Sequence, residues 1–403
     1  MTSPFIDVTT FPGSDLGAKI NAVDAQLGTK PGTILVPSGN YTLITQVLLN
    51  KNHNLHFRYG YYRYGYYKVN STSDTEALIL LKDNTSVFGD GWNTFLEQPH
   101  SNSLIRTFAD SLNGDNDGPA NIFIGDFVVV PANSPTAPVS FAEVIVLGNI
   151  HDACVSHVKF DNPVGDMVNV GDSSNAGYHA SNVWIKECLV NSTTTGIALS
   201  AVNAYNFHFE SNTFVHLAGL DLEINTDSDI LEQFIVSNNI FHGSGPLLVQ
   251  GGKFGNVVNN ILDADRVPDF ETAITAIGVK DSSDVLIADN VVRNYRASGS
   301  VALQSYGSSR NIVISDNKIV DSGRVAAIRL QSISDHCTIR NNDIGNPNPQ
   351  LYSSSNIMEE AGCSNNIVYG NRLRLNGDGS TPSINLAGSG SKAWSNIIGS
   401  VLV

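Results

Sequence analysis

Short stretches of alternating apolar and polar residues, each ending in asparagine, recur along the chain from about residue 150 onward. They read FHFESN over 207–212, FIVSNN over 234–239 and IVISDN over 312–317. A period of two is typical of a β-strand with one buried face. A polar turn follows each asparagine, and a second short alternating strand follows the turn, as over 326–330.

The spacing of the repeated asparagine predicts the architecture. Successive copies lie 21 to 30 residues apart, at Asn212, Asn239, Asn260, Asn290, Asn317, Asn342 and Asn371. This step fits one coil of a parallel β-helix and is too short for a propeller blade of roughly 40 residues. A coil cannot bury its apolar face alone, so stacked coils would share a core of inward Val, Ile and Leu. We expect the asparagines to form a ladder of amide hydrogen bonds between coils.

The first 50 residues predict a cap for this all-β solenoid. Ser14 would cap a short helix and Gly28 would end it. The apolar face of the helix would comprise Leu16, Ile20, Val23 and Leu27. Such a helix would cover the strand edges that the open end of a solenoid exposes.

The chain is predicted to be a single β-helix domain over residues 1–403. Residues 1–50 would form the N-terminal cap and first coil, about 51–150 the early coils with Tyr-rich and loop insertions, and 151–403 the regular coils. Two loops, 110–118 and 131–138, are expected to protrude and to wall a groove.

Three motifs near the N-terminus carry a resemblance to a known superfamily. The segments DVTT at 7–10, GA-x-IN at 17–21 and P-x-G-x-Y at 37–41 resemble the opening of pectate-lyase-like proteins, which are right-handed parallel β-helices. The coils resemble those of the same superfamily. Because its members include lyases, hydrolases, fructotransferases, epimerases and phage tailspikes, the resemblance implies the fold and leaves the activity open.

Composition excludes several classes of function. The chain has 23 Lys and Arg against 38 Asp and Glu, a net charge of −15 at pH 7, which disfavours nucleic-acid and anionic-membrane partners. No apolar run approaches the roughly 20 residues that span a bilayer. The N-terminus lacks the features of a signal peptide, and we expect a secreted, extracellular protein whose leader has been trimmed.

The four cysteines are too few and too scattered for a disulfide scaffold. We expect buried free thiols, and only Cys337 with Cys363 is worth testing as a disulfide.

One face of the second strand in each coil is the candidate binding surface. Side chains of every second residue point outward, and neighbouring coils lie about 4.8 Å apart. The alternation predicts the outward pairs Asn169/Gly171, Ala198/Ser200, Asp221/Glu223, Leu248/Gln250, Gly278/Lys280, Ala302/Gln304 and Arg329/Gln331. Small residues would form a shallow floor beside polar groups suited to sugar hydroxyls. The predicted substrate-binding residues on this face are Asn169, Ser200, Gln250, Lys280, Gln304 and Arg329.

Asp221 and Glu223 are the candidate catalytic pair. In the stretch LDLEI over 220–224 they would project from one face, about 6.6 Å apart at Cα, near the roughly 6.5–9.5 Å spacing of inverting glycosidases. Repulsion between their ionised forms would raise one pKa and leave a proton for the leaving oxygen. The alternative is the solvated face of an acidic protein. Glu210 is an outside catalytic candidate.

Resemblances to two kinds of enzyme bear on the candidate catalytic residues. Inulin fructotransferase carries a catalytic Glu on an outward strand position that Glu223 or Asp221 would match, but its corner Asp is replaced here by Ser211, so only Glu210 could substitute. Asn225-Thr226-Asp227 is similar to a polygalacturonase motif whose Asp-Asp partner is missing. Asp227 and Asp229 are weak candidates for Ca²⁺ ligands or belong to an ordinary turn.

The segment RYGYY at 58–62 is repeated at once at 63–67. Its tyrosines, Tyr62 and Tyr64 among them, would form an aromatic platform for sugar rings or a subunit contact. The alternative is a duplicated hairpin that extends one coil.

Three functions remain open. The first is a glycoside hydrolase-like enzyme, without a cofactor, that cleaves a neutral or weakly charged extracellular polysaccharide with Asp221 and Glu223. The second is a lyase acting by β-elimination, which needs a base beside a uronic carboxylate and for which Ca²⁺ is possible. The third is a non-catalytic, tailspike-like glycan-binding solenoid, for which a homotrimer is the candidate assembly.

Overall fold

The computed structural model describes most of the chain, in thirteen stretches. These are residues 4–64, 77–98, 103–107, 118–131, 143–163, 166–171, 180–223, 231–243, 246–264, 275–345, 355–373, 382–399 and 401–402. The loops predicted at 110–118 and 131–138 lie almost wholly outside them. Two compact units are present: Met1–His208 with Asn225–Asp229, and Phe209–Ile224 with Ile230–Val403. The single domain predicted over the chain stays a prediction.

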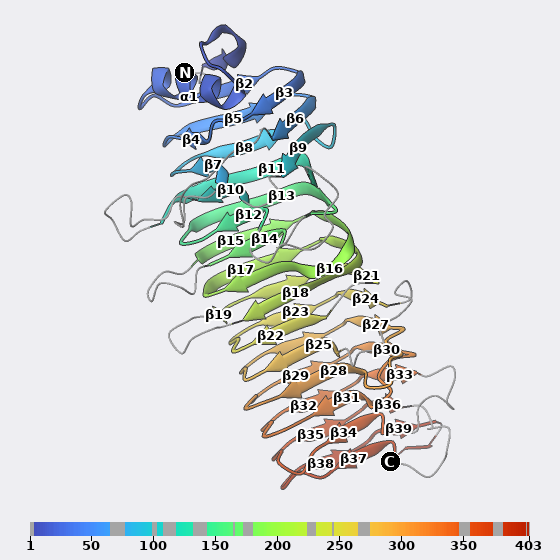
Figure 1. Ribbon diagram of the computed structural model, residues 1–403. Coiled ribbons are helices and arrows are strands. Elements are labelled where there is room, and N and C mark those ends of the chain that lie inside the picture. The colour runs from blue at the N-terminus through green and yellow to red at the C-terminus, as the bar shows by residue number, and fades with distance from the viewer. Residues whose placement is uncertain are drawn as a thin grey trace. The chain divides into compact units, whose positions relative to one another are not determined.

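The second unit repeats a coil of three short strands (Figure 1). The first sheet contains β20 (Ile235–Ser237), β23 (Asn256–Val258), β26 (Leu286–Ala288), β29 (Val313–Ser315), β32 (Thr338–Arg340), β35 (Ile367–Tyr369) and β38 (Lys392–Trp394). The second contains β21 (Ile240–His242), β24 (Ile261–Asp263), β27 (Val291–Arg293), β30 (Lys318–Val320), β33 (Asp343–Gly345), β36 (Arg372–Leu373) and β39 (Ile397–Ile398). The third contains β18 (Thr213–Glu223), β22 (Leu247–Gln250), β25 (Thr275–Lys280), β28 (Val301–Tyr306), β31 (Ala326–Leu330), β34 (Ile357–Glu359) and β37 (Ile384–Leu386). Each strand except the last of each sheet pairs in parallel with its equivalent one coil further on, and the first residues of β18 also pair with β21.

Two short strands of the second unit fall outside this scheme. β19 (Leu231–Glu232) precedes β20, and β40 (Val401–Leu402) pairs antiparallel with β39.

The first unit is built from parallel strands stacked in the same way. One stack contains β1 (Phe5–Asp7), β2 (Gly32–Val36), β5 (His53–Phe57), β8 (Ser86–Gly89), β11 (Ala120–Pro131), β13 (His151–Asp161) and β15 (Ala180–Lys186). The others contain β3 (Gly39–Leu43), β6 (Gly60–Tyr64) and β9 (Thr94–Gln98), and β4 (Val47–Leu49), β7 (Ala77–Leu81), β10 (Ser103–Thr107), β12 (Ile145–Leu147), β14 (Val168–Val170) and β16 (Leu189–Val202). β17 (Ala204–Glu210) holds residues of both units. The predicted parallel β-helix is therefore confirmed.

The predicted asparagine ladder runs through the second unit. The Oδ1 atom of Asn290 accepts the backbone N–H of Asn260 at 2.9 Å and its side-chain amide at 3.0 Å. The Nδ2 atom of Asn290 donates to the carbonyl of Val257 at 2.9 Å. The ladder also includes Asn396, which the sequence analysis did not single out. All its side chains are buried, so the ladder satisfies backbone groups that have no access to water.

The residue before each ladder asparagine is in the left-handed region of backbone space. Its φ is 58° at Asn238, 56° at Asp289 and 69° at Gly370. Asn, Asp and Gly adopt this conformation more readily than other residues. This corner explains the recurring Asn-Asn, Asp-Asn and Gly-Asn pairs, because the turn directs the next asparagine into the interior.

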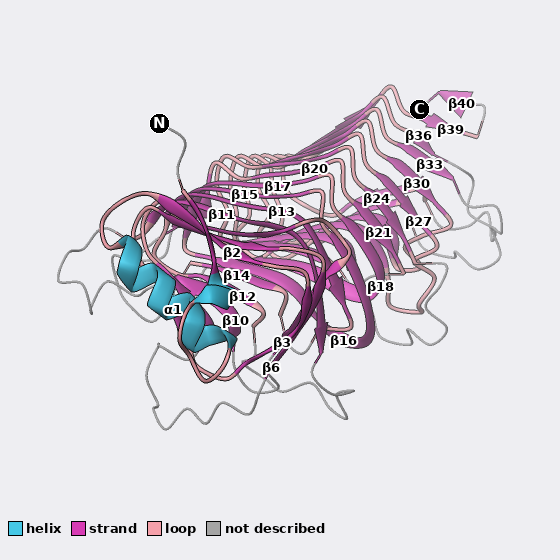
Figure 2. Ribbon diagram, turned by 90° about the horizontal axis from the view of Figure 1, so that it is seen from above, coloured by secondary structure: helices cyan, strands magenta, loops and turns pink. Residues whose placement is uncertain are grey.

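Helix α1 (Leu16–Leu27) lies at the N-terminal end of the first unit and packs against β2, β3 and β4 (Figure 2). The predicted face is confirmed, since Leu16, Ile20, Val23 and Leu27 are buried, and Gly28 ends the helix at φ 63°. The predicted cap was wrong. Asp15, not Ser14, is the N-cap and accepts the Gly17 N–H at 2.9 Å.

We expect Asp15→Asn to lower the free energy of unfolding by about 1 kcal/mol at pH 7, because the charge is lost but water screens part of its effect. Partial burial raises the pKa of Asp15, but hydrogen bonds from the Thr45 amide and hydroxyl and from the Ile44 amide outweigh it and lower the pKa from 3.8 to about 2. The stabilisation is therefore complete above pH 3.8 and is lost as the pH falls towards 2. Urea unfolding of both proteins at pH 7 and pH 2.5 measures this. An equal difference at the two pH values would contradict it.

The cysteines are free thiols, as expected. Cys188, Cys337 and Cys363 are buried, and Cys154 is partly buried. Burial raises the pKa of Cys188 to about 12 and that of Cys337 to about 11. These thiols are protonated and weakly nucleophilic at neutral pH, and Cys337 and Cys363 form no disulfide.

Candidate functional site

The outer face of the third sheet carries the predicted binding residues of the second unit. Alternate residues of its strands, such as Leu247, Val249, Ile277 and Val279, are fully buried. The residues between them face outward, as the alternation predicted. Leu248, Gln250, Lys280 and Arg329 are partly exposed there, whereas Gly278 and Gln304 are buried.

Two columns of outward positions run along this face. In one, positions 223, 250, 280 and 306 are successive neighbours; in the other, positions 221, 248, 278, 304, 329 and 358. The predicted alignment was wrong in the coil of β28. Gln304 lies beside Gly278, and Tyr306 lies beside Lys280, whereas Ala302 had been placed beside Gly278. The shift is two residues, which keeps the same side chains outward.

A similar shift occurs in the first unit. Asn169 in β14 pairs with position 200 of β16, not with position 198. Asn169 is partly exposed there. The side chain of Ser200 lies outside the described residues, as do those of its neighbours in β16.

Hydrogen bonds join the outward side chains of the third sheet. The Nζ of Lys280 donates to Oε1 of Gln250 at 3.3 Å. Gln304 is only 8% exposed and donates to Oε1 of Gln331 at 2.5 Å. The Nε of Arg329 donates to Oε1 of Glu360 at 3.1 Å. These contacts hold amide and cationic groups in fixed positions along the face, as recognition of a polar ligand requires.

Tyr306 is a candidate that the sequence analysis missed. A Cβ atom on Gly278 would lie 3.5 Å from the Tyr306 ring and 2.8 Å from Cδ2 of Leu248. The bare backbone of Gly278 therefore lies between an aromatic and an aliphatic side chain, with Lys280 two residues further along the strand. The alternation VALQSY over 301–306 carries the signal that could have found Tyr306, because it continues two residues beyond Gln304.

The candidate catalytic pair lies in β18. Positions 221 and 223 pair with Leu248 and Gln250, and alternate with Leu220 and Leu222, which are buried. The backbone thus places both positions at the head of the two columns. The side chains of Asp221 and Glu223 lie outside the described residues, and so do Asp227 and Asp229.

The structure does not bring Glu210 to the same sheet. Glu210 ends β17, which pairs with β20 of the first sheet, whereas β18 continues into the third sheet. The corner between them contains Ser211 at φ 59°. Glu210 therefore lies on a different face from positions 221 and 223, which removes the reason for pairing it with them.

Tyr62 does not offer a platform for sugars, contrary to the prediction. It is 1% exposed, its hydroxyl donates to the carbonyl of Arg58 at 2.8 Å, and its ring stacks on Tyr41 at 5.8 Å. Burial raises the pKa of the Tyr62 hydroxyl. The side chain is part of the core of the first unit. The side chain of Tyr64 lies outside the described residues.

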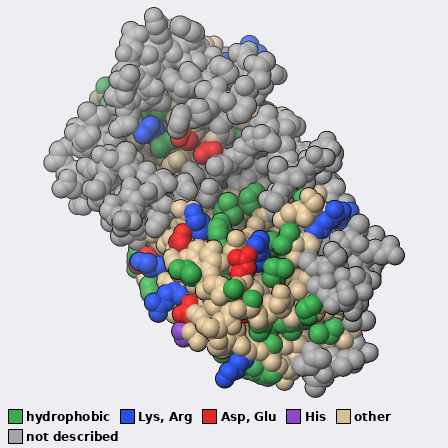
Figure 3. Space-filling model, turned by 60° about the horizontal axis from the view of Figure 1, so that its bottom comes forward, with side chains coloured by type: hydrophobic (Ala, Val, Ile, Leu, Met, Phe, Trp, Pro, Cys, Tyr) green, Lys and Arg blue, Asp and Glu red, His purple; other side chains and the backbone are tan. Residues whose placement is uncertain are grey.

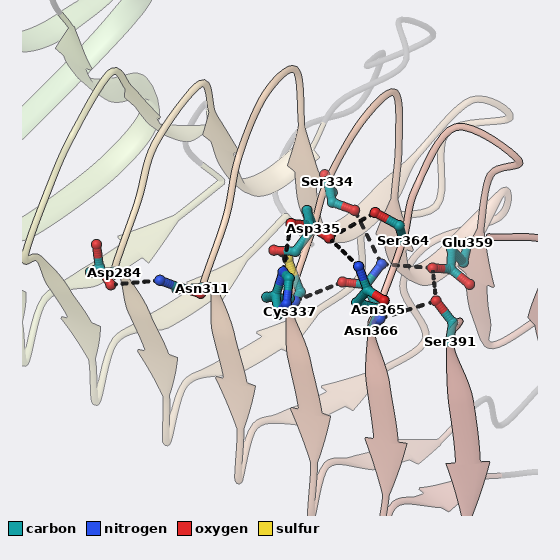
Figure 4. A network of polar contacts seen from close by, with 11 residues as sticks. Asp284, Asn311, Ser334, Asp335, Cys337, Glu359, Ser364, Asn365, Asn366 and Ser391 are labelled. Carbon is teal, nitrogen blue, oxygen red and sulfur yellow. Dashed lines mark hydrogen bonds and ion pairs between the residues drawn. The ribbon is translucent and has the colours of Figure 1, made fainter. Parts of the chain in front are cut away.

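A buried acid in the last coils is structural. Glu359 is 1% exposed and accepts hydrogen bonds from Asn366 and Ser391, each at 2.6 Å, as Figure 4 shows. It also accepts the Gly388 N–H at 3.2 Å. A carboxylate enclosed by protein donors joins successive coils and has no surface for a ligand.

The charges on the described surface are mixed in sign. Figure 3 shows basic and acidic side chains side by side on the described surface that it presents. Among the residues that the structure describes, no three His, Cys, Asp or Glu side chains form a group that could hold a metal ion. No helix in the described part of the chain is both long and apolar enough to cross a membrane.

Comparison with known proteins supports the fold. A family model described as "Right handed beta helix region" matches residues 166–344. No curated protein sequence matches the chain.

Several solved structures share the fold. The A-module of a mannuronan C-5 epimerase from Azotobacter vinelandii is similar at 15% identity over 95% of this chain and 96% of its own, with a TM-score of 0.54. DFA-IIIase (inulin fructotransferase) from Arthrobacter chlorophenolicus A6 without its lid is similar at 15% identity over 89% of this chain and 99% of its own, with a TM-score of 0.59. The tailspike protein of Escherichia coli bacteriophage HK620 in complex with pentasaccharide is similar at 13% identity over 97% of this chain and 74% of its own, with a TM-score of 0.56.

The chain is thus a right-handed parallel β-helix protein. The predicted resemblance to pectate-lyase-like β-helix proteins, inulin fructotransferase among them, is confirmed at the level of fold.

Proposed function

We propose that the outer face of the third sheet binds a polysaccharide and that the chain cleaves its glycosidic bonds. The observation that carries the proposal is the column in which Glu223, Gln250, Lys280 and Tyr306 are successive neighbours. Amide, ammonium and aromatic groups are the ones that bind sugar hydroxyls and the apolar faces of sugar rings. Their spacing of about 4.8 Å from coil to coil suits a ligand extended along the face.

Asp221 and Glu223 would supply the chemistry at the head of the columns. One carboxylic acid protonates the glycosidic oxygen as its bond to the anomeric carbon breaks. The other carboxylate takes a proton from the water molecule that attacks that carbon. Both groups regain their protonation states by exchange with solvent, and the reaction needs no cofactor.

The names of the structurally similar proteins support a carbohydrate ligand. They include a mannuronan epimerase, DFA-IIIase and a tailspike bound to a pentasaccharide. The proposal includes an extracellular location, where such polymers occur.

A panel of extracellular polysaccharides tests the reaction. We expect new reducing ends from one polymer, without the ultraviolet absorbance of unsaturated uronides. Retained binding with no product from any polymer would contradict the proposed cleavage and identify a tailspike-like binding solenoid. A sedimentation measurement would then show whether that solenoid is a trimer.

The pairing of Lys280 with Tyr306 favours β-elimination as the second candidate function. A tyrosine or lysine can remove the proton beside a uronic carboxylate while a cation neutralises that carboxylate. Unsaturated products, and loss of activity with a chelator if Ca²⁺ takes part, would select this lyase over the hydrolase.

Tyr306→Leu should weaken binding of the best glycan in the panel about tenfold, since an aromatic–ligand contact contributes about 1–1.5 kcal/mol. Thermal stability should change little, because the side chain faces outward. Isothermal titration calorimetry measures the affinity. Tyr369→Leu, in the first sheet, is the matched control, and an equal loss in both variants would contradict a role for Tyr306.

A further inference from the structure

Two arginines, Arg293 at the end of β27 in the second sheet and Arg296 in the turn that follows it, are held in place by buried carboxylates. The Nε of Arg293 donates to Oδ2 of Asp263 at 2.7 Å, and the Nε of Arg296 donates to Oδ2 of Asp321 at 2.5 Å. The aspartate side chains are 7% and 9% exposed, whereas those of the arginines are 47% and 49% exposed. Each arginine is therefore held at Nε by a buried carboxylate, while about half of its side chain remains exposed.

An asparagine joins the two pairs into one array. The Nδ2 of Asn294 donates to Oδ1 of Asp263 at 2.7 Å, and its Oδ1 accepts from Nη2 of Arg296 at 2.6 Å. Asn294 has φ 67°, so it forms the left-handed corner that directs Arg293 and Arg296 from either side. The array contains residues of β24 and β27 and of the turns that follow β27 and β30.

Both arginines have N–H donors that form no hydrogen bond to the described residues. A guanidinium group has five N–H donors. Among the described residues, Arg293 uses only its Nε–H, and Arg296 uses its Nε–H and one on Nη2. His242 is the neighbour of Asp263 one coil earlier, and its buried Nδ1 atom lies 3.9 Å from Oδ2 of Asp263 and makes no hydrogen bond to the residues that the structure describes.

We propose that Arg293 and Arg296 form a binding site for an oxyanion carried by a glycan, either a carboxylate or a sulfate ester. Planar N–H groups in a fork match such oxyanions with two parallel hydrogen bonds. Because Asp263 and Asp321 bind the Nε atoms, an incoming anion would not have to displace them. The site lies at the end of β27 and in the turn that follows it, away from the third sheet, so it does not rest on catalysis at positions 221 and 223.

Saturation-transfer NMR with four probes tests the site and identifies the anion. The probes are glucuronate, glucose 6-sulfate, glucose and inorganic sulfate. We expect binding of at least one charged sugar and none of glucose under the same conditions. Binding of glucuronate alone identifies a carboxylate site, and binding of both charged sugars identifies a general oxyanion site. Binding of inorganic sulfate alone, or of no anion, would overturn the proposal.

The double variant Arg293→Lys, Arg296→Lys separates binding from structure. Lysine keeps a cation beside each buried carboxylate but lacks the forked N–H groups of the guanidinium. We therefore expect the charged sugar to bind about tenfold more weakly, which corresponds to the loss of one charge-assisted hydrogen bond. Arg372→Lys, an exposed arginine of the same sheet, should leave binding unchanged. Unaltered binding in the folded double variant would overturn the proposal, and the single variant Arg296→Lys decides if the double variant does not fold. Asp221→Asn should bind the charged sugar normally, so failure here is distinct from failure of the proposed catalysis.

Discussion

Asp221→Asn and Glu223→Gln should each lower turnover of the cleaved polysaccharide by about 10²–10⁴-fold, the usual contribution of a general acid or base. Each amide keeps the shape of the side chain but cannot donate or accept the proton that the reaction moves. Because positions 221 and 223 alternate with the buried Leu220 and Leu222, neither change should disturb the core. Reducing-end assays of turnover, with thermal melts of each variant, measure both effects.

A matched control removes a charge elsewhere in the same unit. Asp316→Asn changes the charge equally at an exposed corner where φ is 59°, a conformation that asparagine also adopts. It should retain full activity. The pH profile separates the two roles, since losing the acid or the base removes one limb of a bell-shaped curve. Full activity in both Asp221→Asn and Glu223→Gln would exclude the assignment.

The repeat could be predicted from the sequence because a buried corner imposes a strict requirement. Only a residue that accepts and donates at once can satisfy the backbone groups around Asn290, which bonds to both Asn260 and Val257. Such a position repeats in every coil, so it appears in the sequence as a period. Asn396 follows the same rule. Its strand, KAW over 392–394, has no clear alternation of apolar and polar residues, so the sequence pattern does not indicate it.

The register of the third sheet could not be predicted in the same way. The side chains alternate with a period of two, so Ala302 and Gln304 fit the outward position beside Gly278 equally well. The turn before β28 differs in length from the turns of neighbouring coils, and so does not fix the pairing. The error separated Lys280 from Tyr306, its neighbour in the structure, and concealed the aromatic residue of the site.

The predictions for the helix N-cap and for Tyr62 were wrong because contacts with residues far away in the sequence determine both. Ser14 and Asp15 are both good N-caps by residue type, but only Asp15 also accepts the N–H of Thr45, at 3.0 Å. Tyr62 belongs to a repeated tyrosine segment that suggests a surface, yet stacking on Tyr41 places it inside. Neither contact is visible in local sequence.

Asn290→Asp should lower the free energy of unfolding by about 3–5 kcal/mol at pH 7, the cost of leaving a buried charge uncompensated. The Nδ2 atom of Asn290 donates to the carbonyl of Val257 and to Oδ1 of Asn317, at 2.9 and 3.0 Å. An ionised carboxylate would place an acceptor against both. Burial would raise the pKa of the new aspartate above its ordinary value of about 3.9, so the loss should be small at pH 3 and grow as the pH rises. Urea unfolding at pH 3 and pH 7 measures it.

The same substitution on an exposed asparagine isolates the effect of burial. Asn311 donates to Oδ1 of Asp284 at 3.0 Å on the surface, and Asn311→Asp should cost less than about 1 kcal/mol, because water solvates the charge and salt screens its repulsion from Asp284. Both asparagines lie in the second unit and make side-chain hydrogen bonds between coils, so they differ chiefly in access to water. Equal losses for the two variants would mean that the ladder hydrogen bonds stabilise the coils no more than surface contacts do.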